Sequence, residues 1–186
     1  EGMYFEYNIE GPKTVHWPSE DRATVMIAFE DKPLGPVTPP MDWDYNDWVG
    51  TVEITAEVFG NDTEGYNYMS GITFDFTRKV RMAGATHRWR LQEGVFPCNG
   101  TYELSVNGAL VESGVYDSAL GIDLLLLNTG DATELTARVS IVFDEMCPFT
   151  LPEWDDNTFH GESLFFDPYL INNNTLEEVH IGDVRM

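Results

Sequence analysis

Basic residues are scarce in this chain of 186 residues: ten lysines and arginines stand against 32 aspartates and glutamates, for a net charge of −22. A surface this acidic repels phosphates, which excludes nucleic acids and anionic membranes as partners. Long apolar runs are also missing, so neither a membrane-spanning segment nor a signal-peptide core is predicted. Because the chain starts at Glu1 rather than Met, we expect a processed, secreted protein without membrane insertion.

Cysteine is nearly absent as well. Cys98 and Cys147 are the two in the chain, and neither belongs to a CxxC motif. The four histidines show no HxH or HExxH spacing, which argues against zinc or copper. In an exported protein we expect Cys98 and Cys147 to form a disulfide, which would stabilise the fold by about 4 kcal/mol. Buried free thiols are the alternative.

Catalytic signatures are equally sparse. The sequence contains no GxSxG nucleophile motif, no glycine-rich phosphate loop and no Cys/His arrangement typical of nucleophilic catalysis. Paired carboxylates can hydrolyse glycosidic bonds, but acidic residues are so abundant here that no pair stands out. We therefore predict a protein that is not an enzyme.

What the sequence has in quantity is alternation of apolar and polar residues, the pattern of half-buried strands. It occurs at 25–29, 51–58, 72–77 and 135–143, without a competing helical stripe. The run 122–127, which is more continuously apolar with Asp123 as its one polar residue, suits a central strand, and Asn107-Gly108 is a hairpin turn signal. These patterns predict an all-β fold, an antiparallel β-sandwich of jelly-roll type.

An acidic cluster follows the strand predicted at 25–29. Six oxygen-bearing side chains fall within eighteen residues, and in the second half of the stretch they occupy alternate positions, as in the calcium loop of an EF-hand. With Lys32 as the one cation among them, they predict a Ca²⁺ site, although Mg²⁺ and a solvated acidic turn remain alternatives. The proposed ligands are Glu30, Asp31, Asp42, Asp44, Asn46 and Asp47.

Several segments together resemble the LruC-type domains of exported bacterial proteins. The N-terminal signature covers 27–31 (IAFED) and 42–49 (DWDYNDWV), and later matches follow in the family's order at 140–144 (SIVFD), 167–172 (DPYLIN) and 178–181 (EVHI). The resemblance runs from about residue 23 to 182. It implies a secreted β-sandwich with a calcium site at the acidic cluster, and it implies no enzymatic activity.

The N-terminus carries a further strand pattern, which ends at Gly11-Pro12. We therefore divide the chain into an N-terminal strand, 1–12, and one sandwich domain, 13–186. The strand either closes its own sheet or docks on the sheet edge of a neighbouring subunit, and head-to-tail docking builds a homo-oligomeric filament. Its alternating apolar positions are Met3, Phe5, Tyr7 and Ile9.

Three sequons predict glycosylation at Asn61, Asn99 and Asn173. His180 is expected to be a satisfied structural histidine, with a place in the metal site or a hydrogen bond to a carboxylate as the alternatives. The predicted function is a calcium-binding structural subunit of an extracellular fibre. The alternative is a monomeric adhesion or carbohydrate-binding module, whose glycans would stack on exposed rings among Trp17, Trp43, Trp48, Trp89 and Trp154.

Overall fold

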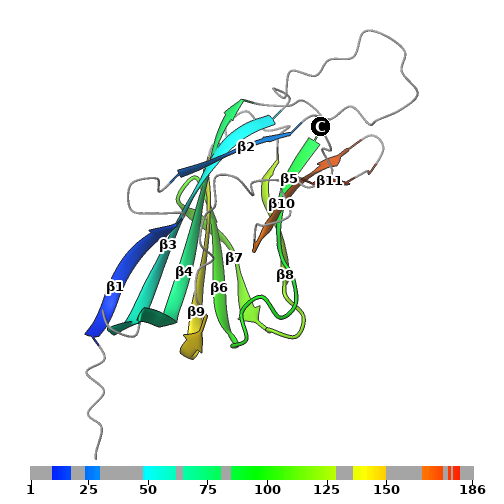
Figure 1. Cartoon of the computed structure of the whole chain (residues 1–186). Helices are drawn as coiled ribbons and strands as arrows, with labels where there is room; N and C mark the ends of the chain where they lie inside the picture. The colour runs from blue at the N-terminus through cyan, green and yellow to red at the C-terminus, as the bar shows by residue number, and fades with distance from the viewer. Residues whose placement is uncertain are drawn as a thin grey trace, which may run out of the picture.

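Every regular element in the described part of the chain is a β-strand (Figure 1). The computed structural model describes residues 10–17, 24–29, 48–61, 65–80, 85–128, 136–149, 165–173, 176 and 178–180. No helix long and apolar enough to cross a membrane is found among these residues. The strands are β1 Glu10–Trp17, β2 Thr24–Phe29, β3 Trp48–Asn61, β4 Gly65–Val80, β5 Ala85–Leu91, β6 Gly100–Val106, β7 Ala109–Tyr116, β8 Ile122–Asn128, β9 Thr136–Pro148, β10 Asp167–Asn172 and β11 Glu178–His180.

The strands form two antiparallel sheets. The larger sheet has the order β1-β3-β4-β9-β6-β7, with β2 also paired to β3, and the smaller sheet has the order β11-β10-β5-β8. Figure 1 shows the larger sheet fanning from β1 to β7, with the smaller sheet beside it. The predicted antiparallel β-sandwich is confirmed. Long crossovers place β9 between β4 and β6, and β10 beside β5.

One apolar core lies between the sheets, and it is built from the alternating residues of the sequence. Ile54 of β3, Phe74 of β4 and Ile141 of β9 are buried on the larger sheet, while Trp89 of β5 is buried on the smaller one. The rings of Phe74 and Trp89 lie 4.9 Å apart and join the two layers. The period of two thus places every second side chain of these strands in the core.

Two local predictions had different outcomes. Asn107 and Gly108 have positive φ angles of 49° and 80°, as a two-residue hairpin turn requires, and they join β6 to β7.

The run 122–127 was predicted to be a central strand, and this is wrong: among the described strands, β8 is an edge strand of the smaller sheet. Its apolar run is explained instead by the adjacent buried pair Leu126 and Leu127, which the core covers.

The first described strand differs from the one predicted. Residues 3–10 were expected to form a strand ending at Gly11-Pro12, but β1 begins at Glu10 and continues through Pro12 to Trp17. A register shift between Glu10 and Lys13 accommodates the proline on this edge strand, where a missing N–H is tolerated. The positions Met3, Phe5, Tyr7 and Ile9 lie outside the described residues.

Both β1 and β2 pair with the same edge of β3. β2 pairs with β3 from Trp48 to Glu53, and β1 continues from Ile54 to Gly60. The two strands therefore act as one interrupted edge strand. At the opposite edge of the sheet lies β7, which pairs with β6.

Candidate functional site

The predicted calcium ligands, Glu30, Asp31, Asp42, Asp44, Asn46 and Asp47, lie outside the described residues. Within the described part of the chain, no group of three or more His, Cys, Asp and Glu side chains is placed to hold a metal ion. The segment 30–47 begins and ends at one paired position, because Phe29 of β2 lies opposite Trp48 of β3. The calcium site stays a prediction.

The two cysteines lie side by side in the core. Both are buried free thiols in the structure. Burial, together with a hydrogen bond to the Cys98 thiol, raises the pKa of Cys147 to about 12. A thiol with so high a pKa is a poor nucleophile at neutral pH, which argues against a catalytic role. The closeness of the two residues is what the predicted disulfide requires, and the bond itself stays a prediction.

Two of the three sequon asparagines have described side chains, and both are exposed. The Asn99 side-chain oxygen accepts hydrogen bonds from the backbone N–H and the hydroxyl of Ser118, at 3.0 and 3.1 Å. That of Asn173 accepts a 2.8 Å bond from the Thr86 hydroxyl. Asn61 ends β3. Glycosylation stays a prediction at all three positions.

The predicted aromatic platform has no counterpart in the described tryptophan side chains, because Trp17 and Trp89 are both buried in the core. Edge-to-face contacts with Phe165 and Phe166 hold Trp17 in place. The side chains of Trp43, Trp48 and Trp154 lie outside the described part of the chain.

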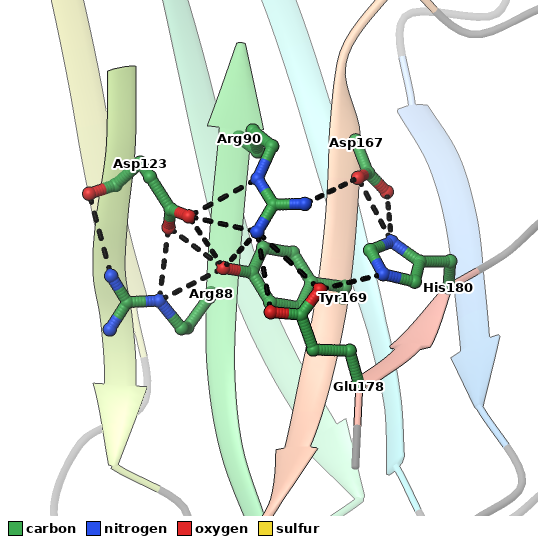
Figure 2. A network of polar contacts seen from close by, with 7 residues as sticks. All are labelled: Arg88, Arg90, Asp123, Asp167, Tyr169, Glu178 and His180. Carbon is green, nitrogen blue, oxygen red and sulfur yellow. Dashed lines mark hydrogen bonds and ion pairs between the residues drawn. The ribbon is translucent and has the colours of Figure 1, made fainter. Parts of the chain in front are cut away.

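The most elaborate polar constellation among the described residues covers the outer face of the smaller sheet (Figure 2). Strand register brings it together. Arg90 of β5 lies between Asp167 of β10 and Asp123 of β8, while Tyr169 lies between Arg88 and His180 in the next row. We call the seven residues the four-strand network: Arg88, Arg90, Asp123, Asp167, Tyr169, Glu178 and His180.

Asp123 is the centre of this network. Its carboxylate accepts bonds from Arg88 Nε at 3.0 Å, from Arg90 Nη2 at 3.0 Å and from the Tyr169 hydroxyl at 2.7 Å. Burial opposes ionisation of Asp123, but these three donors outweigh it and hold its pKa below the ordinary value. Burial and the bond to Asp123 both raise the pKa of Tyr169. Asp123 is thus ionised and Tyr169 protonated at neutral pH.

His180 closes the other end of the network. Its Nδ1 lies 2.9 Å from Asp167 and its Nε2 lies 3.0 Å from Glu178. Both contacts are hydrogen bonds when both ring nitrogens carry a proton, that is, in the imidazolium form. The ring also stacks on Tyr169, with centroids 5.0 Å apart. The carboxylate contact that the sequence left open as an alternative for His180 is thus present on both ring nitrogens.

Opposite charges alternate across the network. Arg88 and Arg90 contact the carboxylates of Asp123, Asp167 and Glu178, and the Arg90 guanidinium also packs 4.6 Å from the centre of the Tyr169 ring. Each of these charged groups therefore contacts an opposite charge. Such an arrangement braces four strands, β8, β5, β10 and β11.

An open hollow of about 400 Å³ adjoins the network. Arg90 and Asp123 contribute to its wall, together with Gln92, Glu93 and the exposed Leu120. The guanidinium and the carboxylate that border the hollow are engaged with each other at 3.0 Å. The wall of the hollow therefore carries one mutually paired arginine and aspartate, together with the Glu93 carboxylate.

His180 is the one member of the network that the sequence pointed to, and the other six residues were not predicted. Alternation in β5 offered a partial signal, because Arg88 and Arg90 occupy the outward positions between buried His87, Trp89 and Leu91. Their acidic partners lie more than 30 residues away in the chain, so only strand pairing identifies them. The clustering of arginine and aspartate side chains therefore results from strand pairing and not from a local sequence motif.

Comparison with known proteins found no family model, curated protein or solved structure that matches this chain, so its resemblance to LruC-type domains rests on the quoted motifs alone.

Proposed function

We propose that the chain is a non-enzymatic, secreted, calcium-binding β-sandwich that serves as a structural subunit of an extracellular fibre, assembled by exchange of its N-terminal strand. The supporting observation is a strand pattern next to a sheet edge. Residues 3–9 alternate like a strand and directly precede β1, which pairs with the edge of β3 as far as Gly60. Such a terminal strand can pair with the exposed sheet edge of a second copy.

The proposed calcium site is supported by the pairing of the two residues that flank the acidic segment 30–47. Paired residues of antiparallel strands have Cα atoms about 4.5–5.5 Å apart. Since Phe29 and Trp48 are such a pair, Glu30 and Asp47 are attached to the same point of the sheet. The two halves of the cluster thus start close together, and a bound Ca²⁺ would neutralise carboxylates that otherwise repel one another.

Removal of calcium is expected to destabilise the protein. A ligand that binds the folded state alone adds about 2.7 kcal/mol to the free energy of unfolding at a concentration of 100 Kd. We expect the melting temperature, followed by circular dichroism, to fall when EDTA is added and to recover with excess Ca²⁺. The variant Asp42→Asn/Asp44→Asn should lose this response. An unchanged melting temperature in EDTA would contradict a stabilising metal.

The assembly state can be seen directly. We expect negative-stain microscopy of the purified chain, with Ca²⁺ present, to show long filaments of regular repeat. The acidic subunits repel one another, so filaments should be favoured at physiological salt over low salt, where the repulsion is unscreened. Discrete particles of 21.1 kDa under all these conditions would instead favour the monomeric adhesion or carbohydrate-binding module.

A further inference from the structure

The far edge of the larger sheet, β7, offers an unusually open strand. It runs for eight residues from Ala109 to Tyr116, and among the described strands it pairs with β6 alone. Edge strands expose backbone N–H and C=O groups that can pair with another chain. Nearly all of its side chains are exposed, up to the buried Tyr116.

Exposed apolar side chains accompany this open edge. Val115 of β7 and Val142 of β9 both lie opposite Thr101 of β6, so all three belong to one row on the outer face of the sheet. Val115 is 75% exposed, Val142 is 59% exposed, and Leu110 further along β7 is 58% exposed. A strand added next to β7 would contact Leu110 and Val115 as cross-strand neighbours and would extend the apolar row that continues to Val142.

The β1 half of the opposite edge is protected in ways that β7 is not. β1 carries Pro12 and Lys13, and its register is shifted between Glu10 and Lys13. Proline, lysine and irregular register are the devices by which natural sheets prevent edge-to-edge pairing. β7 contains neither lysine nor proline, and its one charged residue is Glu112. The β2 half of the opposite edge also lacks both residue types, but it is six residues long against eight in β7, so β7 is the longer unprotected edge strand.

The N-terminal residues of the same copy cannot reach this edge and pair with it. Five strand-to-strand steps separate β1 from β7, which is about 24 Å at about 4.8 Å per step. Nine extended residues span at most about 30–32 Å. Crossing the sheet would leave about two residues for pairing, whereas the alternating segment 3–9 is seven residues long. A second copy has no such restriction.

We propose that residues 3–9 of one copy pair with the exposed edge of β7 of a second copy. The second copy in turn donates its own residues 3–9 to a third copy, so the contact repeats head to tail. The alternating Met3, Phe5, Tyr7 and Ile9 then lie beside β7, in reach of Leu110 and Val115 of the acceptor. Donor and acceptor are different surfaces, so the contact does not close and generates a fibre. This inference rests on the proposed strand exchange and adds the identity of the acceptor.

Complementation between two full-length variants tests the pairing. Val115→Lys places a charge on the acceptor edge, and Phe5→Asp/Tyr7→Asp removes the apolar face of the donor. We expect each variant alone to be monomeric by light scattering, with association weakened about tenfold or more. An equimolar mixture should form 1:1 dimers and nothing larger, because one variant retains a donor and the other retains an acceptor.

Two controls keep the test specific. Met26→Lys adds the same charge at a side chain that is 69% exposed on β2, at the other edge, and should leave assembly unchanged. Leu110→Lys is a second acceptor variant and should behave like Val115→Lys. Unchanged melting temperatures would show that all variants fold.

The outcomes distinguish a wrong acceptor strand from a failure of the proposed strand exchange itself. If the donor variant blocks assembly but both acceptor variants assemble normally, β7 is not the acceptor, while strand exchange stands. If the acceptor variants block assembly and the donor variant does not, another segment occupies β7 and the inference is overturned. An unmodified chain that stays monomeric overturns both.

Discussion

Acidification from pH 7.5 to 4.5 is expected to remove about 2.7 kcal/mol from the free energy of unfolding through His87 alone. This side chain is fully buried on β5, with the rings of Phe29 and Phe76 at 6.2 and 5.8 Å. Burial lowers the pKa of His87 from 6.5 to about 3. Between these values the unfolded chain binds a proton that the folded chain does not, so stability falls as the pH drops below 6.5.

The matched comparison is His87→Leu, which retains the volume and cannot be protonated. Urea unfolding of both proteins at pH 7.5 and 4.5 isolates the histidine, because every other titrating group is common to the two chains. The stability difference should shift by about 2.7 kcal/mol in favour of the variant at the lower pH. Parallel pH profiles would show that His87 does not titrate as its burial requires.

Replacement of Asp123 by asparagine is expected to cost about 1–3 kcal/mol of stability at pH 7. The substitution retains the shape of the side chain but removes the charge shared by Arg88 and Arg90, and it leaves the Tyr169 hydroxyl without an ionised acceptor. The groups are partly exposed, so the cost falls below that of breaking a fully buried pair. Urea unfolding monitored by tryptophan fluorescence measures it.

The control for Asp123→Asn is Asp75→Asn on the larger sheet. Asp75 accepts two bonds from Arg138, at 2.6 and 2.9 Å, but this is an isolated pair with an exposed arginine. An isolated surface pair is worth about 0–1 kcal/mol. Equal costs for the two variants would contradict the view that the network acts as a unit. The ordinary pKa of Asp123 is 3.8 and the network lowers it, so its contribution should persist above that pH.

The fold class was readable from the sequence because strand burial depends on local alternation. Val52, Ile54, Ala56 and Val58 are buried and belong to one face of β3, as their spacing predicts. The turn at Asn107-Gly108 was equally local, since both residues adopt positive φ. The boundaries were less reliable: Pro12 was taken to end a strand, but an edge position tolerates proline.

The four-strand network could not be read from the sequence in the same way. Its members come from β5, β8, β10 and β11, and the register between these strands decides which charges face each other. Nothing local to Arg90 specifies that Asp123 and Asp167 lie on either side of it. Sheet order likewise made β8 an edge strand, against the expectation from its apolar run.

By itself, the sequence determined the all-β class, the core faces of the strands, one hairpin turn and the net charge of −22. These properties depend on the period of the residues and on their charge, which can be read within a few positions of the chain. Only the tertiary structure decided which strands lie at the edges of the sheets, and which distant charges meet. The reason is that edges and cross-strand rows exist only after strands far apart in the chain have paired.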